Sequence, residues 1–143
     1  MNTWIVASAN LDLVHSIFNA WERGDYSSAE WAHPEMEYVF VDGPSPGRWK
    51  GQRKGSRDFL GAWEDFRIEA EEFLELDSER VLALTRFKGR GKRSGLELEK
   101  MRAEGATVFH IRGGKVVKRV SYFNRERALA DLGLSSKADA PRS

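Results

Sequence analysis

The sequence contains no cysteine, and this excludes disulfide bonds, cysteine-ligated metal sites and thiol nucleophiles. Its three histidines, His15, His33 and His110, lie too far apart in the chain to give a standard metal-ligand spacing. No apolar run approaches the roughly 18 residues of a membrane span, and the N-terminus lacks a secretory signal pattern. We therefore expect a cytoplasmic protein that binds no metal and needs no cofactor.

An excess of charge of one sign is absent as well, because 23 basic residues nearly balance 22 acidic residues and the formal net charge is +1. Such a chain has no overall field that would attract nucleic acid or an anionic membrane. The basic loop GRGKRSG at 89–95 could contact nucleic acid, but the segment at 64–79, which precedes it, is strongly acidic. Neighbouring strands of opposite charge pair across the outer face of a sheet, so we expect neither a nucleic-acid nor a membrane partner.

The chain does have enough apolar residues for one core, since 41% of its 143 residues are hydrophobic and 31% are charged. These proportions fit a single domain. We place this domain at 1–134, because residues 135–143 are small and polar without an apolar anchor, which is typical of a flexible tail. Five tryptophans are many for this length, and they belong either to the core or to a platform for a flat ligand.

Three helices are predicted in the first half of the chain. In Ala9–Arg23 the apolar residues recur at spacings of three and four, which is typical of an amphipathic helix. Asp25 can cap a second helix over Tyr26–Trp31, which His33–Pro34 would end. A third helix is predicted for Gln52–Phe66, with an apolar side formed by Phe59, Leu60, Trp63 and Phe66.

β-Branched and aromatic residues predict the strands. The segment GPSPGRWKG at 43–51 contains too much glycine and proline for a regular element. Gly113–Gly114 can supply positive φ at both central positions of a hairpin turn. The predicted strands are Glu35–Asp42, Arg67–Leu76, Arg80–Lys88, Leu96–Ile111 and Lys115–Phe123, and a short helix, Arg125–Leu132, follows them. We therefore predict an α+β fold in which three N-terminal helices pack on a curved, mostly antiparallel sheet that encloses a pocket.

The order of these elements resembles the cone-shaped α+β barrel of NTF2-like proteins, in particular the SnoaL-like branch of polyketide cyclases and ketosteroid isomerase-like proteins. The resemblance covers nearly the whole chain and is carried by WERGD at 21–25, Gly51, the loop at 89–95, GKVV at 114–117, YFNR at 122–125 and ALADLGL at 128–134. It implies a hydrophobic cyclic or polyketide-like ligand inside the barrel and a homodimer that pairs through the sheet. It leaves the activity open, because this fold hosts isomerases, cyclases, hydrolases, dehydratases and non-enzymatic binders.

Asp42 stands where the resemblance places the proton-shuttling aspartate of ketosteroid isomerases, at the end of the first strand and nine residues before Gly51. A carboxylate at the mouth of an apolar pocket suits a general base. The oxyanion donors of that site are missing, because the tyrosine position falls at Ile17 or Phe18 and the second acid falls near Ala106. Steroid isomerisation is therefore not expected. The alternative role for Asp42 is an Asx-turn at the strand end.

An inward Asp42 defines the rest of the predicted site through strand alternation, because side chains along a strand point to the two faces in turn. The predicted third helix would cover the pocket with Phe59 and Trp63, and the loop before it would close the mouth with Trp49. These three residues, together with Tyr38, Phe40, Arg119, Ser121 and Phe123 of the strands, are predicted to contact the ligand. The inward strand residues are Tyr38, Phe40, Ala106, Val108, His110, Arg119, Ser121 and Phe123.

Two further residues are candidates for assisting Asp42. Arg86 lies two and four residues after two leucines, on the same face of the predicted strand, and is expected to point inward with them. A buried arginine needs an anionic partner, either a structural carboxylate or a substrate carboxylate or enolate. His110 suits a proton shuttle or a hydrogen bond to a backbone carbonyl. Ser121 occupies the position of the last-strand aspartate of limonene epoxide hydrolases, so their pattern is broken. We predict either a cofactor-independent acid/base enzyme that uses Asp42 with Arg86 or His110, or a non-catalytic module that binds a ligand or dimerises.

Overall fold

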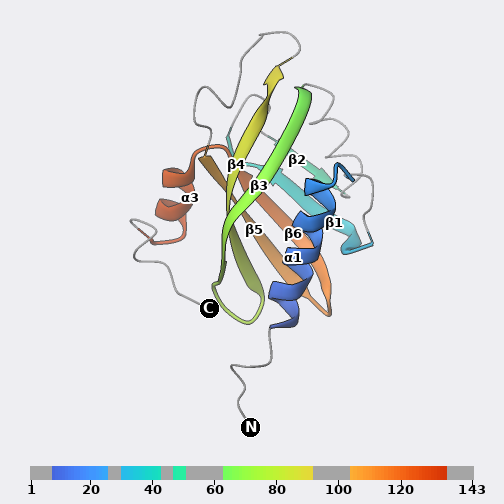
Figure 1. Cartoon of the computed structure of the whole chain (residues 1–143). Coiled ribbons are helices and arrows are strands. Elements are labelled where there is room, and N and C mark those ends of the chain that lie inside the picture. Colours follow the sequence, from blue (N-terminus) through green and yellow to red (C-terminus); the bar gives the residue numbers. More distant parts are fainter. Residues whose placement is uncertain (1–7, 26–29, 43–46, 51–62, 92–103, 135–143) are drawn as a thin grey trace.

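One sheet of six strands separates two helices in the computed structural model, which describes residues 8–25, 30–42, 47–50, 63–91 and 104–134 (Figure 1). The α+β class is confirmed. The elements are helix α1 (Ala9–Glu22), strands β1 (Ala32–Phe40), β2 (Gly47–Lys50), β3 (Trp63–Glu75), β4 (Arg80–Gly91), β5 (Glu104–Arg112) and β6 (Lys115–Tyr122), and helix α3 (Arg125–Asp131).

The strands follow the order β2-β1-β6-β5-β4-β3, and every neighbouring pair is antiparallel except β1 and β6. The parallel pair joins the first half of the chain to its end and places Tyr38 beside Arg119 and Phe40 beside Ser121. The sheet is mostly antiparallel, as predicted. It does not close into a barrel among the described residues, because β2 and β3 remain its edges.

Helix α1 forms where the apolar spacing predicts it. The Ser8 hydroxyl caps it by accepting hydrogen bonds from two backbone N–H groups of its first turn, at 3.2 and 3.4 Å. Gly24 adopts a φ of 83° directly after it, a conformation that favours glycine. Its apolar stripe is no more than 1% exposed and consists of Val14, Ile17, Phe18 and Trp21.

The prediction of three N-terminal helices is wrong for the described residues, where α1 is the one N-terminal helix. Residues 26–29 and 51–62 lie outside the description, and residues 30–31 form a turn. Trp63 to Phe66 belong to β3 and not to a helix, because the antiparallel pairing with β4 extends as far as the Trp63–Gly91 pair. Backbone pairing in the sheet here overrides a local apolar spacing that also fits a helix.

Gly47–Lys50 was expected to be irregular but forms β2, which pairs with Glu37–Phe40 of β1. The pairing covers the edge of β1 that β6 leaves open, and an ion pair between Arg48 and Glu37 at 2.5 Å supports it. His33–Pro34, expected to end a helix, lie inside β1 instead. The predicted strands at 67–76, 80–88 and 115–123 and the final helix are confirmed to within a few residues at their ends.

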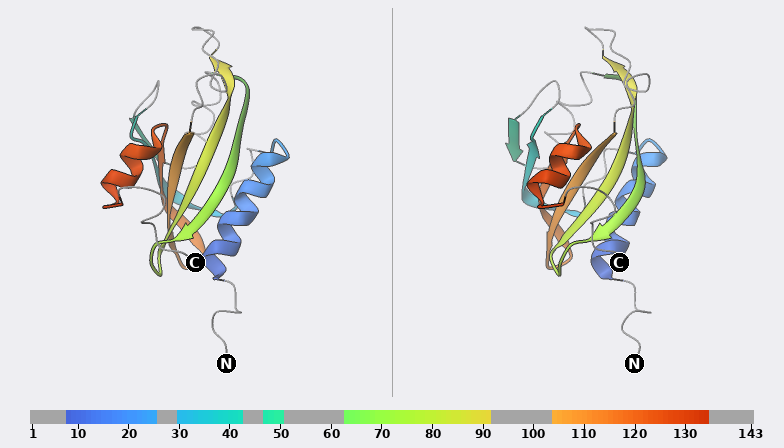
Figure 2. Two further views of the ribbon diagram at one scale, coloured as in Figure 1. Left: turned by 60° about the vertical axis from the view of Figure 1, so that its left-hand side comes forward. Right: turned by 90° about the vertical axis from the view of Figure 1, so that its left-hand side faces the viewer.

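Helices α1 and α3 lie on opposite faces of the sheet (Figure 2), and each face carries its own core. We call the face that packs against α1 the inner face and the face that packs against α3 the outer face. The inner core contains the α1 stripe with Tyr38, Phe40, Ile68, Val81, Ala83, Phe87, Phe109, Ile111 and Val116. The outer core contains Leu74, Leu82, Leu84, Ala106, Val108, Tyr122, Ala128 and Leu129.

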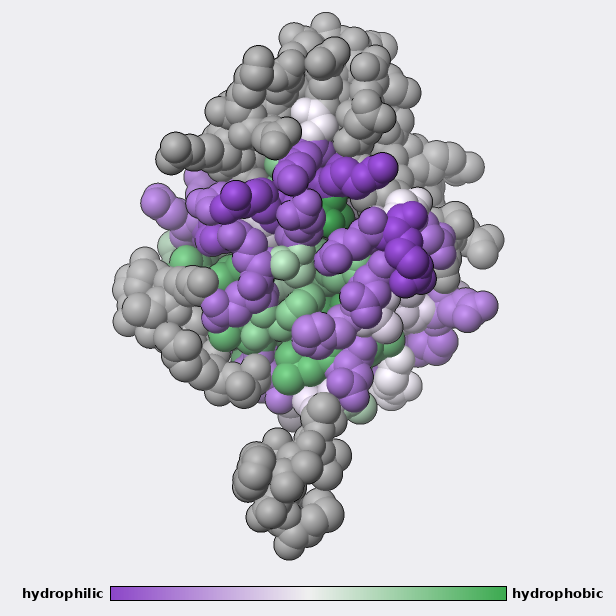
Figure 3. Space-filling view, viewed as in Figure 1, coloured by the Kyte–Doolittle hydropathy of each residue, from purple (hydrophilic) through white to green (hydrophobic). Residues whose placement is uncertain are grey.

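The edge strand β3 is protected by charge. On the side of the molecule where β3 faces the reader, hydrophilic residues enclose a central apolar area (Figure 3). Glu69 and Glu71 of β3 form ion pairs with Lys88 and Arg86 of β4, both at 3.1 Å. These pairs confirm that the acidic and basic strands are neighbours whose charges meet, and they make the edge unsuitable for pairing with another chain.

Candidate functional site

Four buried polar residues gather on the inner face, which is otherwise apolar. We call Thr85, Thr107, Arg119 and Ser121 the polar row; they are exposed by 0%, 0%, 6% and 4%. The strand register brings them together, because Thr107 lies opposite Ser121, which lies beside Phe40 of β1. Burying polar groups in a core lowers stability unless the groups form hydrogen bonds, so this row is the first candidate for function.

Arg119 is held between two aromatic rings. The carbon at the centre of its guanidinium group lies 4.3 Å from the ring centre of Trp21 in α1 and 4.1 Å from that of Tyr38 in β1. Cation–π attraction to both rings stabilises the buried charge. Burial lowers the pKa of Arg119, and the neighbouring Tyr38 acts in the opposite direction. Because a guanidinium group keeps its proton in proteins, the inner face carries a fixed positive charge.

Tyr38 stays a neutral phenol in this environment. Burial raises its pKa above the usual 10, and the charge of Arg119 and a hydrogen bond with Ser121 oppose this shift only in part. Its ring also contacts Phe40 at a centroid distance of 4.6 Å. The phenol and the Ser121 hydroxyl therefore add uncharged hydrogen-bonding groups beside the guanidinium group.

Three oxygen atoms are buried without a hydrogen bond to any group in the described chain: Thr85 Oγ1 and Thr107 Oγ1 on the inner face, and one carboxylate oxygen, Asp42 Oδ2, beyond the end of β1. An unsatisfied buried hydroxyl costs about 1–3 kcal/mol, and natural proteins contain few of them. The two threonines lie on adjacent strands, β4 and β5, with Thr85 opposite Gly105 and Thr107 two residues further along. The three atoms are therefore available to a bound molecule or to ordered water.

Asp42 joins the ends of β1 and β6. Its Oδ1 atom accepts a hydrogen bond from the backbone N–H of Phe123 at 2.5 Å, next to the bond from Val41 N to Ser121 O at 3.0 Å. The carboxylate is thus anchored through one oxygen, while its other oxygen, Oδ2, makes no hydrogen bond in the described chain. The bond from Phe123 gives Asp42 a structural role at the strand end that differs from the predicted Asx-turn, and the role of general base stays a prediction.

A pair of stacked aromatic rings lies beside Asp42. Phe87 of β4 and Phe123 stack at 4.7 Å with an angle of 15° between their planes. Phe87 also fills the space over Gly105, where a Cβ atom would lie 2.3 Å from its ring and 2.2 Å from the Tyr122 carbonyl oxygen. Gly105 is therefore required for the rings to reach this position, and the pair provides a flat apolar surface at the end of β6.

The predicted site residues divide between the two faces. Tyr38, Phe40, Arg119, Ser121 and Phe123 lie on the inner side, and the backbone N–H of Phe123 bonds to Asp42. Ala106, Val108 and His110 lie on the outer face, so their expected inward orientation is wrong. On β5 the inward positions belong instead to Thr107, Phe109 and Ile111.

His110 lies on the opposite face from the polar row, in an outer hollow of about 290 Å³ where the β3–β4 turn meets the β5–β6 hairpin. Burial, then the positive charges of Lys118 and Arg80, lower its pKa below 6.5, and the charges of Asp77 and Glu79 oppose them. The hollow is lined by residues of both charges, many of them in ion pairs with each other. His110 is therefore not placed to assist Asp42.

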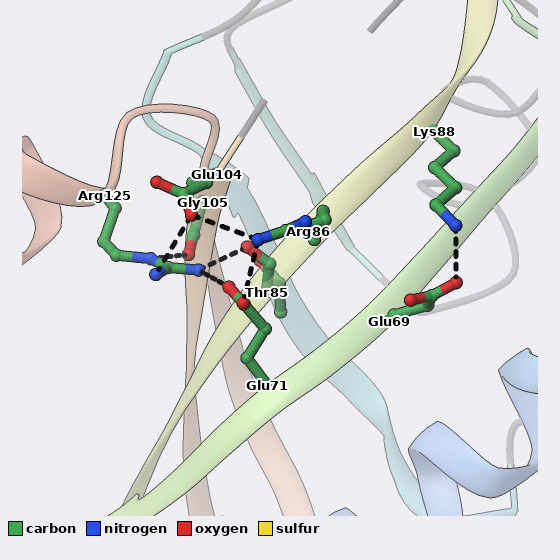
Figure 4. A network of polar contacts seen from close by, with 8 residues as sticks. All are labelled: Glu69, Glu71, Thr85, Arg86, Lys88, Glu104, Gly105 and Arg125. Carbon is green, nitrogen blue, oxygen red and sulfur yellow. Dashed lines mark hydrogen bonds and ion pairs between the residues drawn. The ribbon is translucent and has the colours of Figure 1, made fainter. Parts of the chain in front are cut away.

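Arg86 also lies on the outer face, in a structural network. Its guanidinium group pairs with Glu71 at 3.1 Å and with Glu104 at 3.5 Å (Figure 4). Arg125, the first residue of α3, pairs with the same two carboxylates and donates to the carbonyl oxygens of Thr85 and Gly105 at 2.7 and 3.2 Å. The expected inward orientation of Arg86 is wrong, and its structural ion-pair role is confirmed.

Phe59 lies outside the described residues. For Trp49 and Trp63 the structure describes the backbone alone, in β2 and β3. The sequence analysis missed Thr85, Thr107 and Trp21 as members of the site. Their signal was weak: Trp21 fits the apolar stripe of α1, and a threonine in a strand is ordinary.

Groups of three or more histidine or acidic side chains that could hold a metal ion do not occur in the described residues. Nor does this part of the chain contain a helix that is long and apolar enough to cross a membrane.

No family model and no curated protein matches the sequence, but solved structures match the fold. An NTF2-like protein of unknown function from Burkholderia pseudomallei is 19% identical, with a TM-score of 0.68 over 86% of this chain and 96% of that one. TerC, co-crystallised with polyporic acid, is 19% identical, with a TM-score of 0.66 over 89% of this chain and 98% of that one. A putative polyketide cyclase from Xanthomonas campestris is 16% identical, with a TM-score of 0.59 over 85% and 95% of the two chains.

Other structural neighbours are described as a SnoaL-like polyketide cyclase and as a protein of ketosteroid isomerase-like fold. The chain therefore has the NTF2-like fold, as its sequence predicts. At these identities the likeness extends to the fold and not to the reaction.

Proposed function

We propose that the inner face lines a binding site for a hydrophobic cyclic or polyketide-like molecule, and that Asp42 transfers a proton to or from this ligand without a cofactor. The observation that carries the proposal is the set of buried oxygens without hydrogen bonds in the described chain, Thr85 Oγ1 and Thr107 Oγ1 on the inner face and Asp42 Oδ2 beyond the end of β1. Binding sites for small molecules combine an apolar lining with a few polar groups of this kind. The polyporic acid complex of TerC supports an aromatic ligand class.

The geometry suggests a role for each group. A flat ligand would lie against Phe87 and Phe123, with an acidic C–H group close to Asp42 Oδ2. Asp42 would take this proton, and the electron pair left on carbon would move to a conjugated carbonyl oxygen. Hydroxyl donors of the polar row would stabilise the resulting enolate, and Asp42 would return the proton to a second position. Anchoring of Oδ1 by the Phe123 N–H fixes the direction of Oδ2.

Exchange of an acidic C–H group tests proton transfer before the natural substrate is identified. We expect the protein to catalyse hydrogen–deuterium exchange in 2-tetralone, a bicyclic ketone, as followed by NMR in D₂O. Asp42→Asn should slow the catalysed exchange by about 100-fold or more, because it removes the base. The asparagine can still accept the Phe123 N–H bond, so the strand ends should stay joined.

Asp131→Asn is the matched control. Asp131 is an exposed carboxylate of α3 that accepts a bond from Tyr122 on the outer face at 3.0 Å. Its substitution should leave exchange unchanged. Equal exchange rates in the wild-type protein and Asp42→Asn would refute the assignment of Asp42 as the base.

A non-catalytic ligand-binding protein is the second candidate. The observation in its favour is the bond from Phe123 N to Asp42 Oδ1, which gives the carboxylate a structural task at the end of the sheet. This candidate predicts that aromatic compounds bind to the wild-type protein and to Asp42→Asn with similar affinity, and that neither protein catalyses exchange.

A further inference from the structure

The inner face carries its fixed positive charge at the end remote from Asp42. Arg119 and Phe123 occupy inward positions on the same strand, with Ser121 between them. Four residues of extended strand span about 13 Å at roughly 3.3 Å per residue. Asp42 bonds to the backbone of Phe123, so this span separates the backbone of Arg119 from the strand end where the proposed base is anchored. This is the length of a ligand with two or three fused rings.

The aromatic rings around Arg119 fix its orientation and leave its charge in place. Trp21 and Tyr38 lie over the guanidinium group at 4.3 and 4.1 Å, and rings stabilise a cation without neutralising it. A stacked guanidinium group directs its N–H donors outward in its own plane, where they match the geometry of a carboxylate. The positive field therefore acts on whatever occupies the neighbouring surface.

The two threonines provide the independent observation of a ligand. Thr85 and Thr107 are fully buried, and their hydroxyl groups make no hydrogen bond in the described chain. Thr107 lies opposite Ser121, and its neighbour on β5 at the next inward position, Phe109, lies opposite Arg119. Thr107 thus lies between the levels of Arg119 and Phe123 along the strands, and Thr85, which pairs with Gly105, lies at the level of Phe123. The middle and one end of a flat ligand would bind there.

We infer that Arg119, with the hydroxyl groups of Thr107 and Thr85, forms an anion-binding subsite, and that the natural ligand is an aromatic or polyketide acid. Its ionised oxygen, a carboxylate or an enolate, binds at Arg119, and its further oxygens bond to the threonines. The inference rests on the proposed function, because it names the ligand class of the same inner-face site. It requires no assumption about the base, so it holds for an enzyme and for a non-catalytic binder.

Matched acidic and neutral probes test this subsite. Isothermal titration calorimetry would compare 2-naphthoate with 2-naphthamide, and anthracene-2-carboxylate with its carboxamide, which differ mainly in charge. We expect the wild-type protein to prefer each acid by about tenfold or more, equivalent to about 1.4 kcal/mol. In Arg119→Met the ratio should fall to about one, since a neutral side chain gives the acid no advantage over the amide.

Arg112→Met is the charge control, because it removes a cation whose side chain is 74% exposed on the outer side. It should leave the preference unchanged. Arg119→Lys keeps the charge without the planar fork and should retain part of the preference. Thr107→Val should weaken binding of the acid by several-fold, and the protein should still fold.

The outcomes distinguish failure of the anion subsite from failure of the proposed inner-face binding site. Equal affinity of the wild-type protein for acid and amide, or an undiminished preference in Arg119→Met, would overturn the anion subsite and leave the inner-face binding site standing. Binding of none of the four probes would overturn the proposed function and the subsite with it. If Arg119→Met fails to fold, the wild-type ratio and Arg119→Lys still decide, because a lysine that prefers the acid as strongly as arginine contradicts recognition by the fork.

Discussion

The two faces of the sheet differ in whether the polar groups close to their cores are paired. On the outer face the charged groups close to the core are paired, as Arg125 and Arg86 are with Glu71 and Glu104. On the inner face two fully buried hydroxyl groups remain without a hydrogen bond in the described chain. Paired groups hold the structure together, whereas unsatisfied groups reduce its stability. The difference is what the proposed function expects, with an outer face that stabilises the fold and an inner face that binds a ligand.

The comparison is sharpest between neighbouring positions on one strand. Thr85 and Arg86 are adjacent residues of β4, and their side chains point to opposite faces. Arg86 finds two carboxylates, and the Thr85 carbonyl accepts a bond from Arg125 at 2.7 Å, but the Thr85 hydroxyl has no such bond. Selection for stability alone would have favoured valine at Thr85, because valine has the same shape without the hydroxyl group.

The largest expected effect comes from breaking the outer network at Arg125. Its side chain is 16% exposed, and Arg125→Met would leave two backbone carbonyls and two carboxylates without their shared donor. We expect a loss of about 3 kcal/mol in the free energy of unfolding, measured by urea denaturation.

Arg86→Met is the control for this experiment, because it removes an arginine from the same network whose side chain is 50% exposed. Its cost should stay below about 1 kcal/mol. Similar losses in the two variants would show that burial of Arg125 does not decide the strength of the network.

Sequence reasoning reached the fold because the signals for it are local. The apolar spacing of α1, the Gly113–Gly114 turn and the β-branched runs of the last strands each indicate their own element. It failed at Trp63–Phe66 and at Gly47–Lys50, where pairing between strands distant in the sequence decides the structure. Such pairing outweighs local propensity and leaves no local signal.

The site was predicted in part for a related reason. On β6 strand alternation, counted from an inward Asp42, placed Arg119 and Ser121 on the face of Tyr38, where the structure has them. On β4 the run from Val81 to Thr85 is fully buried from both sides, and alternation cannot tell the two faces apart. Leu82 and Leu84 of β4 face α3. Because Arg86 was assigned to the face of these leucines and that face was taken as the inner one, its predicted orientation was wrong.

A smaller effect, of opposite sign, is expected from removing an unsatisfied hydroxyl group from the inner face. Thr107→Val keeps the shape of the side chain and removes a buried hydroxyl group that has no hydrogen bond in the described chain. We expect the free energy of unfolding to rise by about 1 kcal/mol, while affinity for an acidic aromatic ligand falls. Urea denaturation and calorimetry on the same preparation would measure the two changes.

Thr107→Ser provides the matched control, because it keeps the hydroxyl group and removes one buried methyl group. It should lower stability by about 1 kcal/mol and preserve ligand binding better than valine does. A valine variant that is less stable than the wild-type protein would mean that the hydroxyl group is already satisfied and that the contrast between the faces is smaller than the structure indicates.

The smallest effect concerns His110 in the outer hollow. Because burial and the charges of Lys118 and Arg80 lower its pKa in the folded protein below 6.5, the unfolded chain binds the proton more readily than the folded chain does. The contribution of His110 to stability is therefore complete above about pH 6.5 and is lost as the pH falls from there through the folded pKa. NMR titration of the His110 ring should give a pKa below 6.5, and His110→Gln should lose less stability than the wild-type protein between about pH 7.5 and about pH 5.5. Lys118→Gln should move the pKa of His110 upward in part, since burial is the larger cause; a ring that titrates at or above 6.5 would show that the hollow does not disfavour the charged form.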